Sequence, residues 1–300
     1  MGDIDERISS SLYPLHRCKI LHLVRHGQGF HNVAQLTEKD AALCYEYFDA
    51  SLTPIGWQQV DNLRRHISEN GILSKVELVV TSPLLRTMQT AVGVFGGGDC
   101  IDNTTPPLMI AGGGNSNHTP ISSTGCPPVM AVEWCREHLG VLPCDKRRSI
   151  SEYRPIFPAI DFSLIEADED ILWQPDVREK EEEIAARGIF FYNWLWTRKE
   201  KEIAIVSHGG FLRHTLALFG VDCDPSVRNE ICNDFTNCEL RSMVLTDRSD
   251  SPSQPNSAES NSAIGKSLVT TDYPGGVPPG PDVPSDNDDK DLLANEKASA

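Results

Sequence analysis

The segment Ile20–Asn32, ILHLVRHGQGFHN, decides how the rest of the sequence is interpreted. Its first five residues form an apolar run with the length and composition of a buried strand in a parallel sheet. Arg25 and His26 follow this run directly, and Gly27 has no Cβ, so it allows backbone and ligand to approach closely. A single histidine after a strand is more often structural than catalytic. Whether His26 is structural or catalytic therefore depends on which other residues of the sequence are expected to lie near it.

Two more apolar runs end in the same way. Ile203–Val206 leads into Ser207-His208-Gly209, and Glu77–Thr81 leads into a segment that contains Arg86. Open α/β sheets place their sites beyond the carboxyl ends of parallel strands. We therefore expect two histidine and two arginine side chains to meet at one edge of the sheet.

The remaining pattern predicts an α/β fold. Thr53-Pro54 and Ser82-Pro83 each predict the start of a helix, with the hydroxyl residue as N-cap and proline in the first turn. Four more segments are expected as regular elements: strands at Val129–Val132 and Glu239–Leu245, and helices over residues 177–199 and 210–219. Because strands alternate with helices, we expect a three-layer α/β/α sandwich with a mostly parallel central sheet.

Composition divides the chain into four parts. Residues 18–248 are expected to form the folded domain, preceded by an N-terminal extension over residues 1–17. A Gly/Pro-rich insertion over residues 96–128 interrupts the domain, and we expect it to be a flexible segment or a lid. Residues 249–300 are rich in Ser, Pro, Gly and Asp and cannot bury enough apolar surface to offset the entropy of ordering. We expect them to be a disordered acidic tail.

Composition also argues against several classes of protein. The 300 residues have a formal net charge of −16, and no basic stripe offsets it, which argues against nucleic-acid binding. No apolar run approaches the roughly 18 residues of a membrane-spanning helix. The N-terminus lacks the features of a signal or transit peptide. The nine dispersed cysteines contain no C-x-x-C pair, which fits a reducing compartment, so we expect a protein of the cytoplasm or nucleus.

The residues LVRHGQGFHN resemble the signature of the histidine phosphatase superfamily, which has the phosphoglycerate mutase-like fold. Three further blocks match the family in the same order: L-T-x-x-G-x-x-Q at Leu52–Gln59, T-S-x-L-x-R-x-x-x-T-A at Thr81–Ala91, and S-H-G-G at Ser207–Gly210. The match covers residues 19–246. In detail the chain is most similar to the plant and fungal phosphoglycerate mutase-like proteins, in which R-H-G-Q-G is followed by H-N.

The resemblance implies a mechanism that proceeds through a phosphohistidine. His26 would be the nucleophile, and Asn32 would contact the phosphate. Arg25, Arg86 and His208 would hold the oxygens of the phosphoryl group. A planar guanidinium suits this task because it binds two oxygens at once and stays charged. An imidazole attacks only when neutral, and two adjacent cations favour that form. No metal or other cofactor is implied.

The leaving oxygen needs a proton, which the family takes from an acidic side chain after a later strand. The stretch C-R-E-H-L-G is similar to the family's L-R-E-x-x-x-G and points to Glu137, although its glycine comes one residue early. Glu133 lies nearer the end of the expected strand and is the competing choice. The third alternative is that both are solvated carboxylates on a helix surface.

We therefore expect a metal-independent phosphatase or phosphoryl-transfer enzyme that acts on a small or medium phosphorylated substrate, for example in carbohydrate metabolism. A phosphoglycerate mutase is one alternative. It would need further fixed cations, for which Arg147-Arg148 is the candidate pair. A phosphate-binding or interaction protein of weak activity is another alternative. His31 either lines the pocket or simply packs. The sequence sets neither the substrate nor the oligomeric state.

Overall fold

The computed structural model describes residues 13–37, 42–97, 105–219, 223–246 and 270–273. Its centre is a seven-stranded sheet of order β4-β3-β2-β5-β1-β6-β7. The strands are β1 (Cys18–Arg25), β2 (Leu78–Thr81), β3 (Val129–Ala131), β4 (Ile160–Asp161), β5 (Glu202–Ser207), β6 (Leu240–Thr246) and β7 (Thr270–Tyr273). The first five strands in this order are parallel, whereas β6 is antiparallel to β1 and β7 to β6. The prediction of a mostly parallel sheet is confirmed.

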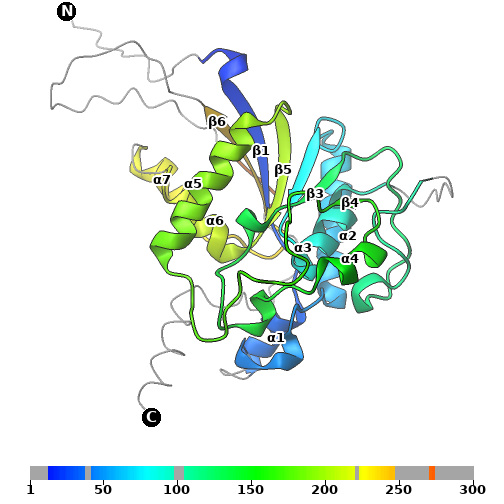
Figure 1. The fold of residues 1–300 in the computed structure, drawn as a ribbon. Helices are drawn as coiled ribbons and strands as arrows, with labels where there is room; N and C mark the ends of the chain where they lie inside the picture. Colours follow the sequence, from blue (N-terminus) through cyan, green and yellow to red (C-terminus); the bar gives the residue numbers. More distant parts are fainter. Residues whose placement is uncertain (1–12, 38–41, 98–104, 220–222, 247–269, 274–300) are drawn as a thin grey trace, which may run out of the picture.

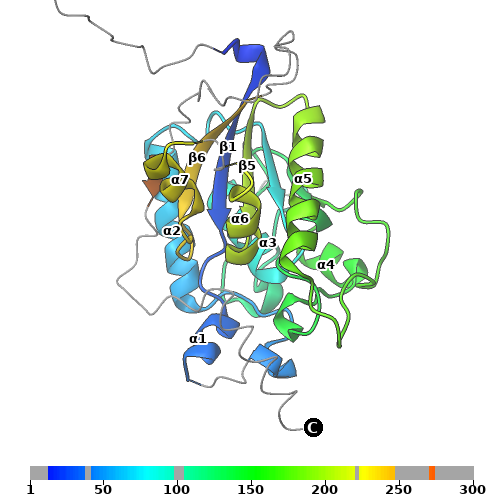
Figure 2. The same ribbon diagram turned by 90° about the vertical axis from the view of Figure 1, so that its left-hand side faces the viewer.

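Helices cover both faces of the sheet (Figure 1). They are α1 (Phe30–Thr37), α2 (Pro54–Glu69), α3 (Leu85–Phe95), α4 (Ile150–Ile156), α5 (Glu181–Thr197), α6 (Gly209–Leu216) and α7 (Pro225–Cys232). The helices α2, α3 and α4 pack on one face, and α5, α6 and α7 pack on the other, which faces the viewer in Figure 2. The expected three-layer sandwich is thus confirmed. The short helix α1 lies beyond the carboxyl end of β1 (Figure 1).

The central strand β5 explains why the sequence shows a continuous apolar run rather than alternation. Its residues Ile203 and Ile205 pack in the core cluster beneath α5 and α6, whereas Ala204 and Val206 pack beneath α2 and α3. All four side chains are fully buried. A parallel strand covered on both faces needs apolar residues at every position.

The two Ser/Thr-Pro signatures behave differently. Thr53 caps α2 as predicted, because its Oγ1 accepts a hydrogen bond of 3.0 Å from the amide of Gly56. The same prediction for Ser82 is wrong, since α3 begins at Leu85 and Ser82 makes no cap. The amide of Leu85 instead donates to Asp49 Oδ1 at 2.9 Å. The helix start is therefore capped from a distant segment, and the Ser82 hydroxyl is left for another contact.

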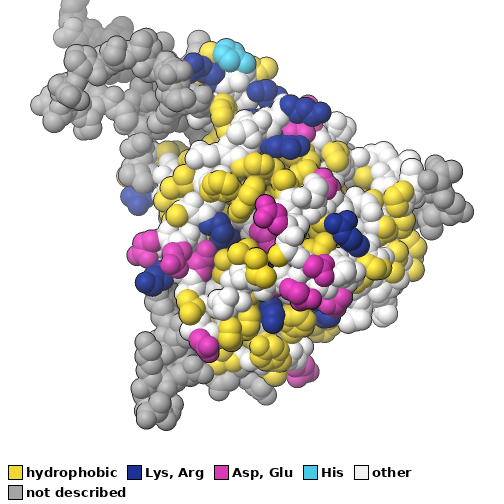
Figure 3. Space-filling model, viewed as in Figure 1, with side chains coloured by type: hydrophobic (Ala, Val, Ile, Leu, Met, Phe, Trp, Pro, Cys, Tyr) yellow, Lys and Arg dark blue, Asp and Glu magenta, His cyan; other side chains and the backbone are white. Residues whose placement is uncertain are grey.

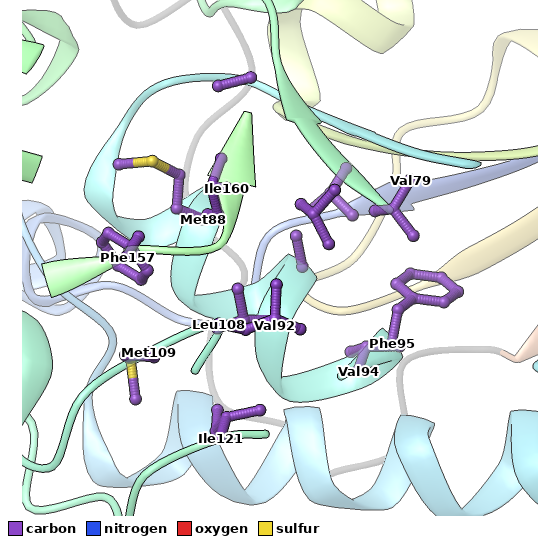
Figure 4. Close-up of a cluster of buried hydrophobic side chains, with 14 of the residues drawn as sticks. Val79, Met88, Val92, Val94, Phe95, Leu108, Met109, Ile121, Phe157 and Ile160 are labelled. Atoms are coloured by element: carbon purple, nitrogen blue, oxygen red, sulfur yellow. The ribbon is translucent and has the colours of Figure 1, made fainter. Parts of the chain in front are cut away.

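Part of the Gly/Pro-rich insertion belongs to the hydrophobic core. Leu108, Met109 and Ile121 pack with side chains of α3 (Figure 4). The amide of Leu108 also donates to the carbonyl of Ile121 at 2.8 Å. This differs from the expectation of a flexible segment or lid, because the few apolar residues of the insertion are the ones that anchor it. Residues 98–104 of the insertion lie outside the described residues.

The ends of the chain are described only in part. Of the N-terminal extension, residues 13–17 are described, and Leu15–Arg17 form a single 3₁₀ turn before β1. Of the expected tail, Thr270–Tyr273 is described, and it forms the edge strand β7. The expectation for the rest of the tail falls outside the described residues.

The surface carries both signs of charge. On the face seen in Figure 3, the Lys and Arg side chains of the described residues are scattered among Asp and Glu rather than gathered in a stripe. Within the described parts of the chain, no helix is long and apolar enough to cross a membrane.

Candidate active site

The two histidines that follow β1 and β5 lie next to each other. These strands are adjacent and parallel, with Arg25 in register with Ser207, so the residues that follow them are neighbours. The ring centroids of His26 and His208 are 5.2 Å apart, and the rings are inclined at 62°. Both side chains are buried. The sheet therefore brings together two side chains that are 182 positions apart in the sequence, the difference between 208 and 26.

The hydrogen bonds of His26 define which ring nitrogen can react. Its Nδ1 lies 2.7 Å from the carbonyl oxygen of Gly27. A carbonyl oxygen only accepts, so Nδ1 carries the proton and Nε2 keeps its lone pair. The Nε–H of Arg86 donates toward that lone pair at 3.3 Å. The unprotonated nitrogen of His26 thus faces a guanidinium group.

Burial and charge both keep His26 neutral. Burial is the main cause that lowers its pKa well below the usual range, and the guanidinium groups of Arg86 and Arg25 lower the pKa further. The hydrogen bond to Gly27 raises the pKa but does not outweigh them. At physiological pH the ring is therefore in the form that can attack an electrophile.

The two arginines are held by fixed acceptors. Arg86 is 1% exposed, and its two terminal nitrogens donate to the carbonyl of Cys144 at 2.5 Å and to Asp145 Oδ1 at 2.9 Å. Arg25 is also buried, and its Nη1 donates to the carbonyl of Phe235 at 2.5 Å. Asp145 is a residue that the sequence patterns did not indicate. No local signal could have found it, because it meets Arg86 from a segment 59 residues further along the chain.

His208 has a partner that also escaped the sequence analysis. Its Nε2 lies 2.8 Å from the hydroxyl of Ser82, the residue expected to cap α3. Its Nδ1 is buried and has no hydrogen-bond partner within the described ranges. Burial, and then the charge of Arg86, lower the pKa of His208 well below the usual range, so its ring is neutral as well. A neutral imidazole with one nitrogen bonded to Ser82 offers the other to a ligand.

Asn32 holds the loop that follows His26. Its side-chain oxygen accepts a hydrogen bond of 2.9 Å from the amide of Gly29. The side-chain amide of Asn237 donates to the same oxygen at 3.5 Å and to the carbonyl of His26 at 3.2 Å. Asn32 therefore lies beside His26, where it fixes the backbone of the segment 26–32.

The two candidate proton donors are in different environments. Both oxygens of Glu133 accept from arginines, Oε1 from Arg147 at 2.7 Å and Oε2 from Arg136 at 2.9 Å. Glu137 instead accepts from the amides of Gly210 at 3.1 Å and Phe211 at 3.0 Å, in the first turn of the helix after His208. Neither carboxylate is fully exposed. The alternative of two solvated surface carboxylates therefore does not describe the structure.

The remaining candidate residues, Arg147, Arg148 and His31, lie in different environments. Arg147 is buried, and its guanidinium donates to Glu133 and to backbone carbonyls of residues 167–169. Arg148 is partly exposed and contacts Asp49 at 3.2 Å. The ring of His31 lies 5.6 Å from that of His26.

Within the described ranges, no group of three or more His, Cys, Asp or Glu residues is arranged to hold a metal ion.

Comparison with known proteins places this arrangement in a family. The model of the histidine phosphatase superfamily (branch 1) matches residues 21–102. The "Phosphoglycerate mutase-like protein 1" of Arabidopsis thaliana is 57% identical over 92% of this chain and 93% of its own length. A second protein of that plant, "Phosphoglycerate mutase-like protein", is 55% identical over 91% of this chain and 97% of its own length. Among solved structures, a mycobacterial glucosyl-3-phosphoglycerate phosphatase matches with 18% identity and a TM-score of 0.41, over 75% of this chain and 89% of that one. On the identities to the plant proteins, the chain belongs to the histidine phosphatase superfamily, among the phosphoglycerate mutase-like proteins.

Proposed function

We propose that this protein is a phosphatase that transfers the phosphoryl group of a small phosphorylated substrate to His26 and then to water. One observation carries the proposal. The Nε2 of His26 is unprotonated and faces the Nε of Arg86 at 3.3 Å, with the neutral ring of His208 beside it. A neutral nucleophile next to a fixed guanidinium is the arrangement that phosphoryl transfer needs, because the transferred group carries its charge on its outer oxygens.

Each site residue then has a defined task. Arg86 and Arg25 bind the phosphoryl oxygens with those N–H groups that the protein carbonyls do not use. When the Ser82 hydroxyl donates to His208 Nε2, the proton of the neutral ring is on Nδ1, and this N–H donates a hydrogen bond to a phosphoryl oxygen. Asn32 keeps the His26 loop in place. The ester oxygen leaves with its bonding electron pair and takes a proton from an acidic side chain. Water later attacks phosphorus and gives a proton to that carboxylate, and the phosphorus–nitrogen bond breaks with its electron pair returning to Nε2.

Glu137 is the proton donor that this proposal favours. Its contacts with the amides of Gly210 and Phe211 place its carboxyl group at the start of α6, next to His208. Glu133 is less suited, because Arg136 and Arg147 engage one carboxylate oxygen each. Neither oxygen is therefore left to face a leaving group.

The phosphoglycerate mutase alternative rests on the names of the plant relatives. A mutase must hold a second phosphate group while the intermediate reorients. Arg147, one of the two cations that the sequence offered, is committed to Glu133 and to backbone carbonyls. Only Arg148 of that pair remains partly exposed. This favours hydrolysis over a mutase reaction.

The test is turnover and labelling of the full-length chain. We expect the wild type to release phosphate from a nitrophenyl phosphate and to carry an acid-labile, alkali-stable ³²P label after a rapid quench. His26→Ala is expected to lose the label and at least about 10⁴-fold of the turnover, as for removal of other nucleophiles. Interconversion of phosphoglycerates that depends on bisphosphoglycerate would favour the mutase. If the wild type shows neither turnover nor label with a panel of phosphate esters, the remaining alternative is a phosphate-binding protein.

A further inference from the structure

A third imidazole belongs to the same site. His31, in the first turn of α1, is 6% exposed, and its ring centroid lies 5.6 Å from that of His26 at an inclination of 47°. Among charged and titratable groups, Arg86 lowers the pKa of His31 most, followed by His26 and Arg25. The His31 ring thus adjoins the ring of His26, whose Nε2 faces the guanidinium of Arg86.

A comparison with His22 shows that His31 is not held as a structural histidine is. His22 is equally buried, and its two ring nitrogens lie 2.7 Å from Ser242 Oγ and 3.0 Å from Glu202 Oε1. The Nδ1 of His31 is buried and has no such partner within the described ranges. The protein therefore fixes the ring of His22 at both nitrogens, but it does not fix the ring of His31 through Nδ1.

Gly29 determines which edge of the His31 ring is turned toward the backbone. A Cβ on Gly29 would stand 2.6 Å from Nδ1 and 2.7 Å from Cε1 of His31, so this edge packs against the glycine. The Nδ1 has no acceptor for a proton within the described residues, and a buried N–H without an acceptor is rarer than a buried acceptor without a donor. The proton of the neutral ring is then on Nε2.

The neutral state of the ring has clear causes. Burial is the largest, and it lowers the pKa of His31 well below the usual range, with Arg86 as the second cause. The charged and titratable groups around it are Arg25 and His26 at the end of β1, Arg86 on α3, and His208 after β5. A neutral ring has a single N–H, so its position on Nε2 sets the only hydrogen bond that the ring can donate.

On the basis of the function proposed above, we propose that His31 is a further catalytic residue, whose Nε2–H donates a hydrogen bond to the phosphoryl group as it is transferred to and from His26. The phosphoryl group would then be bound by two guanidinium groups and by N–H groups of two neutral imidazoles. Such donors act mainly in the transition state, where charge on the phosphoryl oxygens is redistributed. No bond of His31 is formed or broken in this role.

Four substitutions at His31 separate this role from simple packing. In His31→Gln the amide N–H reaches about the position of Nε2, whereas in His31→Asn it reaches about that of Nδ1. His31→Leu and His31→Met fill the space without a donor. We expect Leu and Met to lower kcat/KM for nitrophenyl phosphate by about 10²-fold, the usual cost of one such donor. Gln is expected to restore about tenfold of that loss, and Asn to restore none.

Binding of two inhibitors gives a second measurement. Orthovanadate resembles the five-coordinate transition state, and inorganic phosphate resembles the ground state. We expect His31→Leu to weaken the binding of orthovanadate by about the factor that is lost in kcat/KM, and to weaken the binding of phosphate clearly less. The control is His22→Gln, which removes a buried histidine outside the site. It is expected to lower the melting temperature without changing the ratio of the two inhibition constants.

The outcomes are distinguishable. Wild-type turnover that persists unchanged in His31→Leu, or an equal loss in the Gln and Leu variants, would show that His31 only packs. Restoration by Asn and not by Gln would place the donor on the wrong nitrogen. His31→Met decides the question if the Leu variant does not fold. Absence of turnover and of labelled His26 in the wild type would reject the proposed function itself, before any variant is compared.

Discussion

Two regions of this protein bury arginine side chains, and they use them differently. The first is the arginine–carboxylate network, which consists of Arg136, Arg147, Glu133 and Asp170. Here Arg136 lies 2.6 Å from Asp170 and 2.9 Å from Glu133, and Arg147 lies 2.7 Å from Glu133. Both guanidinium groups are therefore neutralised by carboxylates and have a structural task.

The candidate active site is the second region. Arg86 meets one carboxylate, Asp145, while its Nε faces the neutral ring of His26. The neutral rings of His208 and His31 lie beside that ring. A buried cation that faces neutral imidazoles keeps part of its field for an incoming anion. The difference shows that the partners of a buried arginine, rather than its burial, distinguish a ligand site from a structural network.

The largest expected effect contrasts one arginine from each region. Arg86→Ala is expected to lower kcat/KM by about 10³-fold, because a fixed donor to the phosphoryl group is lost. The free energy of unfolding should fall less in Arg86→Ala than in the Arg136 variant, since Asp145 keeps its ion pair with Arg178 at 2.8 Å. Arg136→Ala is expected to lower the free energy of unfolding by about 3–5 kcal/mol, because Asp170 and Glu133 lose a buried partner.

Kinetics on the folded fraction and denaturant unfolding of both variants provide the measurement. An equal loss of kcat/KM in the two variants would contradict the division into a structural network and a ligand site.

The second prediction compares a carboxylate from each region. If Glu137 protonates the leaving oxygen, Glu137→Gln should slow hydrolysis of an alkyl phosphate by about 10²-fold. Hydrolysis of a nitrophenyl phosphate should change much less, because its leaving group needs no proton. Glu133→Gln should lower stability, through its ion pairs with Arg136 and Arg147, without any dependence on the leaving group.

Glu137 also accepts hydrogen bonds from the amides of Gly210 and Phe211 in the first turn of α6, and a Gln side chain would meet one of these two N–H groups with its own NH2 group. A loss that is the same for both substrates would therefore assign Glu137 to holding α6, and the proton would come from elsewhere.

The sequence was sufficient to predict what depends on local pattern. A strand buried on both faces needs apolar residues throughout, so it stands out in the sequence as an apolar run. Each apolar run that was expected as a strand forms one. Arg25, His26 and His208 follow such strands directly, and they meet because the strands are adjacent and parallel. Their convergence could thus be predicted without any knowledge of the contacts between them.

What could not be predicted depends on partners distant in sequence. Ser82 has the local pattern of an N-cap, but Asp49, 36 residues before Leu85, takes the amide at the helix start. The Ser82 hydroxyl then meets His208, which is 126 residues away. Helix α1 was also missed, because its eight residues begin at Phe30 inside the motif segment. The outcome of such competition between acceptors is set by tertiary structure, which local propensities do not contain.

The smallest effect is expected at Asp145, the residue that joins the two regions. Its carboxylate accepts from Arg86 at 2.9 Å, and its carbonyl oxygen accepts from Arg136 at 2.7 Å. Asp145→Asn keeps an acceptor for Arg86 but removes the charge that holds it. We expect kcat to fall about tenfold, the lower range for a hydrogen bond to a charged group, with KM nearly unchanged.

Asp145→Ala, which removes the acceptor as well, should lose more of kcat than Asp145→Asn. The sign of the Asn effect distinguishes two physical roles. If Asp145 mainly positions Arg86, a neutral acceptor is a poorer anchor and kcat falls. If its negative charge mainly weakens the attraction of Arg86 for phosphate, the Asn variant binds phosphate more tightly and kcat/KM rises. The second result would mean that Asp145 partly neutralises Arg86, as the carboxylates of the arginine–carboxylate network neutralise Arg136 and Arg147. The two regions would then differ only in how far their arginines are neutralised.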